Sequence, residues 1–218
     1  MKTLIVAGGE LSSAFLISCM KTDPPDYVIA ADRGLDVLAE AGIRPDLVLG
    51  DFDSTVLGPG LFAGQGTACE VYPREKDFSD MESAFRAAIE RGSTEMMVLG
   101  ATGGRMDHFL ANVMDLRIPL AAGIPARIVD EQNTIRLMDR PFVLRRQETR
   151  GKYVSLLPLS ETVEHVSLRG FRYEAEDITL QQNCASYGIS NEMEADTAEV
   201  CFSDGILILV ESEDSLTA

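Results

Sequence analysis

Short apolar stretches alternate with longer amphipathic stretches over the first half of the chain. Five apolar runs have the length and composition of buried strands: 3–7, 27–31, 47–49, 70–72 and 96–99. The intervening stretches have helical character, and because strands and helices alternate, the pattern predicts a mostly parallel, Rossmann-like sheet with helices on both faces. In such a sheet, ligands bind beyond the carboxyl ends of the strands.

The clearest helical period lies at 80–91. Its apolar residues recur at the spacing of one helix face: Met81, Ala84, Phe85, Ala88 and Ile89. Ser79 and Glu82 have the spacing of a capping box, and Gly92 is a typical residue after a helix end. The pattern therefore predicts a helix that begins directly after Ser79.

The second half of the chain has a different pattern. Seven short apolar runs with no helical period between them predict strands at 126–129, 134–138, 142–145, 153–157, 165–168, 198–202 and 206–210. Asp204-Gly205 predicts a hairpin turn between the last two runs. We therefore expect an α/β domain over 1–123 and a small all-β sandwich domain over 124–218, with the boundary at Gly123-Ile124-Pro125.

The charge balance excludes two classes of partner. The 218 residues include 19 basic and 35 acidic side chains, which give a net charge of −16. A surface of this sign repels nucleic acid and anionic membranes. No apolar run approaches the roughly 20 residues that a transmembrane helix needs, and the run at 3–7 is shorter than the apolar core of a secretory signal. Four widely spaced cysteines favour reduced thiols, so we expect a cytoplasmic protein.

Asp51 and Asp53 follow the apolar run at 47–49 and are separated by one residue. Two carboxylates at this spacing can reach one point, and like charges that close repel unless a cation lies between them. Three further acidic loops follow apolar runs, at 32–34, 77–80 and 103–108. Together they predict a single oxygen-rich site for Mg²⁺ with phosphate nearby.

The loop at 100–105 is rich in glycine and precedes a helical pattern. Its backbone N–H groups and the helix start can bind phosphate oxygens, and Arg105 adds a fork of donors. The chain has no Gly-x4-Gly-Lys-Ser/Thr loop, no Gly-x-Ser-x-Gly elbow and no evident Ser or Cys nucleophile. These absences fit direct phosphoryl-type transfer to a bound hydroxyl.

These motifs, taken in order, closely resemble the thiamine pyrophosphokinase family: Asp32-Arg33-Gly34, Arg44 to Ser54, Lys76 to Asp80, and Gly103 to His108. The segments 170–173 and 188–192 resemble the thiamine-binding half of that family. The resemblance covers nearly the whole chain. It implies transfer of the pyrophosphoryl group of ATP to the hydroxyethyl oxygen of thiamine, which gives thiamine diphosphate and AMP.

The resemblance also implies roles for individual residues. Mg²⁺ would be held by Asp51, Asp53 and Asp80, and the catalytic set would add Asp77 and Asp107. The expected ATP-binding residues are Asp32, Arg33, Gly103, Gly104, Arg105 and His108.

For thiamine, the resemblance implies a homodimer in which the substrate lies between the catalytic domain of one subunit and the β domain of the other. Ser190 and Asn191 would line the thiamine pocket. Some members of the family place a Trp against the thiamine ring, but this chain has no Trp. Tyr173 is the nearest aromatic residue in motif position, and we expect it to take that place.

Three alternatives follow from the same residues. A pyrophosphokinase acting on a pterin alcohol would have the same acidic motifs, and a sensor could bind Mg²⁺ and a nucleotide without catalysis. Asp51, Asp53 and Thr55 also match the nucleophile motif of haloacid-dehalogenase-like phosphatases, but that motif belongs after the first strand and here follows the third. Incubation with ATP, Mg²⁺ and thiamine distinguishes these hypotheses: formation of AMP, rather than ADP or phosphate, indicates thiamine pyrophosphokinase activity and not a phosphatase or a sensor.

Overall fold

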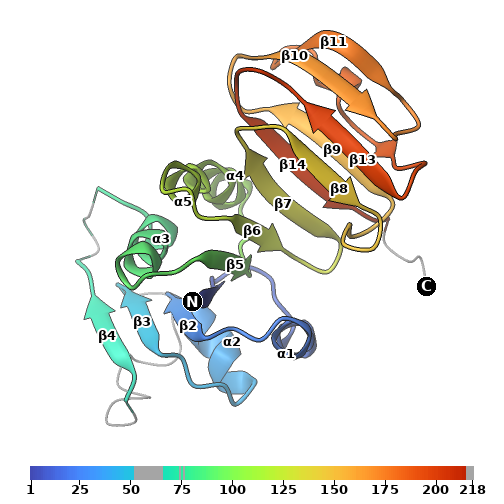
Figure 1. Cartoon of the computed structure of the whole chain (residues 1–218). Coiled ribbons are helices and arrows are strands. Elements are labelled where there is room, and N and C mark those ends of the chain that lie inside the picture. The colour runs from blue at the N-terminus through green and yellow to red at the C-terminus, as the bar shows by residue number, and fades with distance from the viewer. Residues whose placement is uncertain (52–65, 74, 76, 215–218) are drawn as a thin grey trace. The chain divides into compact units, whose positions relative to one another are not determined.

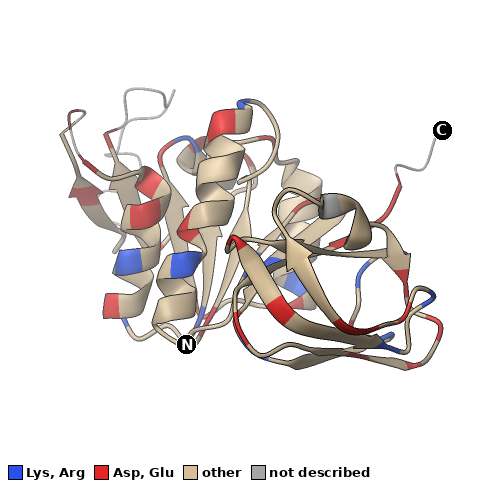
Figure 2. Cartoon of the chain, turned by 90° about the horizontal axis from the view of Figure 1, so that it is seen from above, with Lys and Arg blue, Asp and Glu red and all other residues tan. Residues whose placement is uncertain are grey.

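The structure, a computed structural model, describes residues 1–51, 66–73, 75 and 77–214. The chain forms two compact units, Met1–Glu131 and Gln132–Ala218. The division falls at Glu131/Gln132 rather than after Gly123, because the strand at Ala126–Val129 pairs in parallel with a strand of the first unit. Acidic and basic residues occur in both units (Figure 2).

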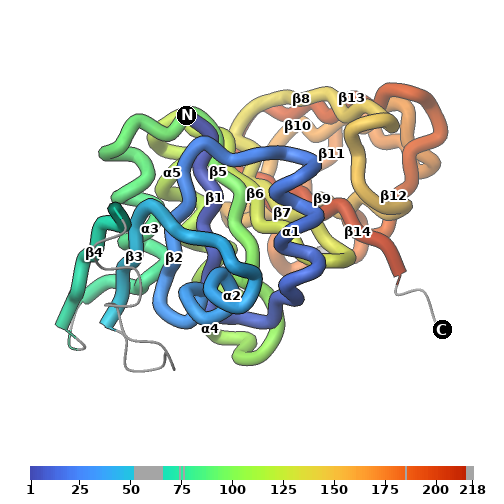
Figure 3. Tube along the Cα trace, turned by 90° about the horizontal axis from the view of Figure 1, so that it is seen from below, coloured from blue at the N-terminus to red at the C-terminus, as the bar shows by residue number. Residues whose placement is uncertain are grey.

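The first unit contains a parallel sheet. Its strands are β1 (Lys2–Val6), β2 (Tyr27–Ala31), β3 (Leu47–Gly50), β4 (Ala68–Val71), β5 (Glu95–Leu99) and β6 (Ala126–Val129). Every neighbouring pair is parallel, in the order β6-β5-β1-β2-β3-β4 (Figure 3). Strands covered on both faces have continuous apolar runs, and Leu4, Ile5 and Val6 in β1 are fully buried.

Helices cover both faces of this sheet, as predicted (Figure 1). They are α1 (Ser13–Thr22), α2 (Gly34–Glu40), α3 (Asp80–Glu90), α4 (Met106–Asp115) and α5 (Arg117–Ala121). Leu16 of α1 and Leu35 of α2 pack against Leu4 and Val6 of β1 in one apolar cluster. On the other face, α3 contacts β2 and β3 and also α4 and α5. No helix among the described residues has the length and apolar character needed to cross a membrane.

The predicted helix after Ser79 is confirmed. The Ser79 hydroxyl accepts the Glu82 N–H at 2.9 Å, which caps α3. The reciprocal half of the capping box does not form, because the Glu82 carboxylate binds Arg86 one turn later at 2.8 Å. Gly92 follows the helix with a φ of 79°, a conformation that glycine adopts readily.

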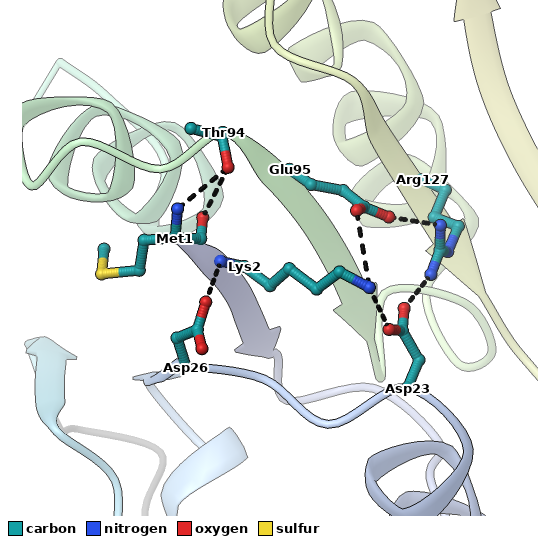
Figure 4. Close-up of polar contacts among 7 residues, drawn as sticks. All are labelled: Met1, Lys2, Asp23, Asp26, Thr94, Glu95 and Arg127. Carbon is teal, nitrogen blue, oxygen red and sulfur yellow. Dashed lines mark hydrogen bonds and ion pairs between the residues drawn. The ribbon is translucent and has the colours of Figure 1, made fainter.

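Charged side chains join the amino ends of three strands (Figure 4). The Lys2 ammonium of β1 contacts Asp23 and lies 3.8 Å from Glu95 of β5. Arg127 of β6 binds the same two carboxylates, at 2.5 Å and 2.8 Å. The Lys2 hydrogen bond lowers the pKa of Asp23. Because this cluster lies at the amino edge of the sheet, opposite the edge where ligands bind, it serves to hold the strands.

The second unit is a sandwich of two antiparallel sheets. Its strands are β7 (Asn133–Met138), β8 (Phe142–Arg145), β9 (Tyr153–Pro158), β10 (Thr162–Arg169), β11 (Ala175–Gln181), β12 (Asn191–Glu192), β13 (Thr197–Cys201) and β14 (Leu207–Ser212). One sheet contains β12-β9-β14-β7 and the other β11-β10-β13-β8. Apolar residues of both sheets, such as Leu156, Val166 and Leu209, form one core. The predicted sandwich is thus confirmed.

Two details of this unit differ from the prediction. The predicted hairpin across Asp204-Gly205 is wrong, because the strands on either side of this turn do not pair with each other. Strand β14 pairs with β7 and β9, whereas β13 pairs with β10 and β8 in the other sheet. The turn residues specify a reversal of the chain but not the partner of the next strand. The sequence pattern also missed β11, a polar edge strand in which Asp177 has a positive φ of 53°.

Candidate active site

A cavity of about 680 Å³ lies at the carboxyl edge of the parallel sheet. Its walls are the loops after β1, β2 and β5 and the first turns of α3 and α4. Because the strands are parallel, these loops all leave the sheet at one edge. The sequence pattern predicted this shared edge, and the structure places eight of the expected site residues in the cavity wall: Asp32, Arg33, Asp80, Gly103, Gly104, Arg105, Asp107 and His108.

The loops after β1 and β5, which both line the cavity, touch through their backbones. The Gly9 N–H donates to the Gly100 carbonyl at 2.7 Å. A Cβ atom at Gly9 would lie 2.5 Å from the carbonyl oxygens of both Gly100 and Thr102, so no larger residue fits. The glycine at this position therefore lets two loops of the site approach each other closely.

The loop after β5 leads into α4 through Gly103 and Gly104, whose φ angles are 80° and 65°. Arg105 occupies the N-cap position of α4 but makes no side-chain capping bond. The first turn of α4 therefore presents the positive end of the helix dipole and backbone N–H groups near the cavity, and one of these groups, that of His108, donates to the Asp107 carboxylate. This arrangement suits an anionic group such as a phosphate.

Arg105 and Asp107 bind each other. The guanidinium donates from Nε to Oδ1 at 3.1 Å and from its terminal nitrogen to Oδ2 at 2.5 Å. The hydrogen bond from Arg105 lowers the pKa of Asp107 to about 2, and the His108 backbone N–H adds to this effect. The residue expected to bind phosphate and the carboxylate expected to take part in catalysis are thus paired with each other in the structure.

Asp32 directly follows β2 and has a positive φ of 45°. Its N–H donates to the Leu49 carbonyl of β3 at 2.9 Å, which brings it beside the end of that strand. A Cβ atom at Gly50 would lie 3.2 Å from the Asp32 Cα, so the residue before Asp51 is in tight contact with Asp32. The end of β3 and the loop after β2 are therefore held close together.

Not every expected residue lies in the cavity wall. Asp80, the first residue of α3, lines it, whereas Asp51 and Asp77 are not among the lining residues. Asp51 is half-buried directly after β3, and Asp77 is exposed before α3. Asp53 lies outside the described residues.

The residues present have the chemistry of a site for a hard divalent cation. Carboxylates are the ligands that Mg²⁺ prefers, and Asp32, Asp80 and Asp107 all face one cavity. Within the described part of the chain, no three His, Cys, Asp or Glu side chains are close enough to form a ready metal cluster. The expected ligand set of Asp51, Asp53 and Asp80 includes the undescribed Asp53.

Sequence reasoning missed Asn112 as part of the cavity wall. Its side-chain amide donates to the Ala101 carbonyl at 2.9 Å and so ties α4 to the glycine-rich loop. Asn112 lies four residues after His108, which places both on one face of α4. That helical spacing was the signal that could have identified it.

The three residues expected to bind thiamine lie together in the second unit. The Tyr173 N–H donates to the Asn191 side-chain oxygen at 3.0 Å, and the Asn191 amide donates to the Tyr173 carbonyl at 2.8 Å. Ser190 precedes Asn191 and donates its N–H to the Ser155 hydroxyl at 3.0 Å. Asn191 is buried, whereas Tyr173 is 61% exposed. Asn191 therefore holds the backbone of Tyr173 and leaves the ring open to a ligand.

Comparisons with known proteins agree with this arrangement. Residues 22–128 match the family model described as "Thiamin pyrophosphokinase, catalytic domain", and residues 142–207 match "Thiamin pyrophosphokinase, vitamin B1 binding domain". The chain is 34% identical to the thiamine pyrophosphokinase of Bacillus subtilis (strain 168) over 98% of its own length and 100% of that protein's.

Solved structures show the same similarity. The crystal structure of the B. subtilis thiamine pyrophosphokinase covers 98% of this chain and 100% of its own, with a TM-score of 0.84 and 28% identity. The thiamin pyrophosphokinase of Geobacillus thermodenitrificans covers 100% of both chains, with a TM-score of 0.82 and 34% identity. The Candida albicans enzyme is only 17% identical but has a TM-score of 0.79 over 97% of this chain and 89% of its own, which supports the fold.

Proposed function

Because this chain belongs to the thiamin pyrophosphokinase family, we propose that it transfers the pyrophosphoryl group of ATP to the hydroxyethyl oxygen of thiamine, giving thiamine diphosphate and AMP. The observation that carries the ATP half of this proposal is the cavity of about 680 Å³ that gathers a glycine-rich loop, two arginines and several carboxylates at one edge of the sheet. The match of the second unit to a vitamin B1 binding domain supports thiamine over a pterin alcohol.

The phosphate groups of ATP bind, in this proposal, to the loop after β5. The backbone N–H groups of Gly103 and Gly104 and of the first turn of α4 supply donors, although the His108 N–H donates to the Asp107 carboxylate in the structure. Arg105 adds a planar fork that matches phosphate geometry. Asp32 and Arg33, which line the cavity from the loop after β2, contact the rest of the nucleotide, and His108 donates from α4.

Arg105 must change partner when ATP binds. In the structure its guanidinium binds Asp107. A polyphosphate brings more negative charge than one carboxylate, so it competes for the same fork of donors. The exchange frees Asp107, whose carboxylate is a weak base while its pKa is held at about 2. Once released, Asp107 can accept the proton that the thiamine hydroxyl loses during transfer.

The metal ligands in this proposal are Asp51, Asp53 and Asp80, with Asp77 beside them. Bound Mg²⁺ supplies charge neutralisation for the transferred phosphates. A cation is needed between these carboxylates and a polyphosphate, because like charges close together repel each other. The same argument explains how a chain with a net charge of −16 binds an anionic nucleotide.

Thiamine binding is proposed for the second unit. The exposed Tyr173 ring offers a face for the cationic thiazolium, an attraction of about 0.5–2 kcal/mol. The Arg172 guanidinium lies 5.7 Å from the centre of this ring, which supports the view that the ring attracts cations. Ser190 and Asn191 complete this part of the pocket.

We further propose that the enzyme is a cytoplasmic homodimer whose thiamine pocket is completed by another subunit. None of the four cysteines forms a disulfide, which supports a reducing compartment. Mixing Asp53→Asn chains with chains altered at both Ser190 and Asn191 tests the shared pocket. Each mixed dimer should regain one intact site, about half the wild-type activity; no recovery despite proven subunit exchange would place the pocket within one chain.

A product assay tests the activity itself. The enzyme is incubated with ATP and Mg²⁺ alone, with thiamine, or with a pterin alcohol, and nucleotides are separated by chromatography. AMP should form only with thiamine, in equal amount to thiamine diphosphate. AMP formed only with the pterin would assign the other acceptor, and ADP or free phosphate would overturn pyrophosphoryl transfer.

A further inference from the structure

One hydrogen bond joins the two helices that form neighbouring walls of the cavity. The Ser79 hydroxyl, at the start of α3, donates to the Asp115 carboxylate, at the end of α4, at 2.9 Å. Asp80, which follows Ser79, lines the cavity, and so does Asp107 in the first turn of α4. The bond therefore links the segment that carries Asp80 to the helix that carries Asp107.

The single hydrogen of the Ser79 hydroxyl is committed to this bond. A serine hydroxyl has one hydrogen to donate, and Ser79 gives it to Asp115 while its oxygen accepts the Glu82 N–H at 2.9 Å. The Ser79 carbonyl also accepts the N–H and the hydroxyl of Ser83, both at 3.0 Å. Ser79 is thus held on both sides, and the position of the adjacent Asp80 follows from it.

Asp115 has no evident task other than this bond. It does not line the cavity. It is half-buried, and burial raises the pKa of its carboxyl, with the nearby Glu82 acting in the same direction. No ion pair of the described residues includes it. Partial burial of a carboxylate is unfavourable, so a favourable interaction with Ser79 is the role that explains its place.

We propose that Asp115 is a positioning residue, which sets Asp80 relative to the carboxylates and phosphate donors of α4 by fixing the Ser79 hydroxyl. The proposal rests on the proposed function in one respect, namely that Asp80 is a metal ligand. Asn112 independently anchors α4 to the glycine-rich loop through Ala101. Loss of Asp115 should therefore free the start of α3 while α4 and the phosphate-binding loop keep their positions.

Because Asp115 holds the start of α3 and Asn112 holds the glycine-rich loop, loss of Asp115 should weaken only the binding that depends on the metal. Asp115→Ala should weaken binding of the magnesium complex of the β,γ-imido analogue of ATP by about threefold to tenfold, the range expected for one hydrogen bond. Binding of the same analogue in EDTA, without metal, should change less than about twofold, because the loop after β5 is intact. Asp115→Asn keeps an oxygen that accepts the Ser79 hydrogen, so it should bind like the wild type.

Isothermal calorimetry with and without Mg²⁺ measures both affinities, and thermal unfolding checks that each variant is folded. Glu90→Ala, which removes an exposed carboxylate from the far end of α3, is the matched control and should bind the analogue normally. Ser79→Ala removes this bond together with the cap of α3, so it should weaken binding of the magnesium complex at least as much as Asp115→Ala. The double variant should lose no more affinity than Ser79→Ala alone.

Asp80→Asn tests the metal-ligand role of Asp80 separately from the positioning role of Asp115. If it weakens binding of the magnesium complex and Asp115→Ala does not, the positioning role is wrong while the metal assignment stands. If Asp80→Asn has no effect, the metal assignment fails and the role of Asp115 fails with it. Equal losses with and without Mg²⁺ in Asp115→Ala would also overturn the proposal, because they indicate a general structural defect.

Discussion

Replacing Arg105 tests whether it exchanges a carboxylate for a phosphate. Both bonds from the Arg105 fork end on Asp107, and they lower the pKa of Asp107 to about 2 from an ordinary 3.8. Arg105→Ala removes the largest cause of this shift and leaves the smaller effects of the His108 N–H and of the His108 side chain. The pKa of Asp107 should therefore rise most of the way toward 3.8.

Carbon-13 NMR of the aspartate side chains measures this change, with Asp107→Asn to assign the signal. At pH 3, Asp107 should be ionised in the wild type and largely protonated in Arg105→Ala. Because the folded pKa is depressed, the pair stabilises the protein above pH 4, and this contribution is lost as the pH falls toward 2. Both side chains are more than half exposed, so the effect on stability is small.

The nucleotide provides the decisive comparison. Binding of the ATP analogue to the wild type should raise the pKa of Asp107, since the carboxylate loses its guanidinium partner and gains anionic neighbours. Arg105→Lys keeps the charge but not the fork; it should raise KM for ATP by about tenfold and leave KM for thiamine unchanged. If the analogue leaves the pKa of Asp107 at about 2, or if the defect is confined to thiamine, Arg105 does not change partner in this way.

Three further predictions concern other parts of the protein. Asp51→Asn and Asp53→Asn should each lower kcat at least tenfold, about 1.4 kcal/mol of transition-state stabilisation, with an unchanged melting temperature; wild-type turnover in saturating Mg²⁺ would contradict the metal assignment. Tyr173→Ala should weaken thiamine binding by about twofold to thirtyfold and ATP binding far less, as measured by calorimetry; an equal loss of both would remove Tyr173 from the pocket. Phe85→Ala should reduce the free energy of unfolding in urea by about 3–5 kcal/mol, because Phe85 is fully buried in α3; a loss below 1 kcal/mol would show that the helix packs differently.

The periodic parts of the fold could be predicted from sequence because burial determines their pattern. The strands around Leu4 and Leu47 are covered on both faces, and the face of α3 that contains Phe85 is buried as its spacing indicated. The partner of β14 could not be predicted in this way, because the Asp204-Gly205 turn has no information about which sheet comes next. Polar edge strands such as β11 are not predicted from the apolar pattern, because they bury little apolar surface.

The site was predictable as a location and only partly as a set of contacts. Parallel strand ends made it clear that the loops containing Asp32, Asp80 and Asp107 would meet, and the structure places all three in one cavity. The pairing of Arg105 with Asp107 was not foreseen, because residues two positions apart rarely face each other in a helix, and here the first of them precedes the helix. The two hydrogen bonds of the Asn191 side chain to the backbone of Tyr173 could not be predicted either, because the two residues are distant in sequence.

Transfer of an intact pyrophosphoryl group is tested most directly by the fate of the β-phosphorus of ATP. The wild-type enzyme is given thiamine, Mg²⁺ and ATP labelled at the β-phosphorus, and the products are separated and counted. All of the label should appear in thiamine diphosphate, and the AMP formed in equal amount should contain none. Label retained in ADP, with thiamine monophosphate as the other product, would show transfer of a single phosphoryl group and contradict the proposed reaction.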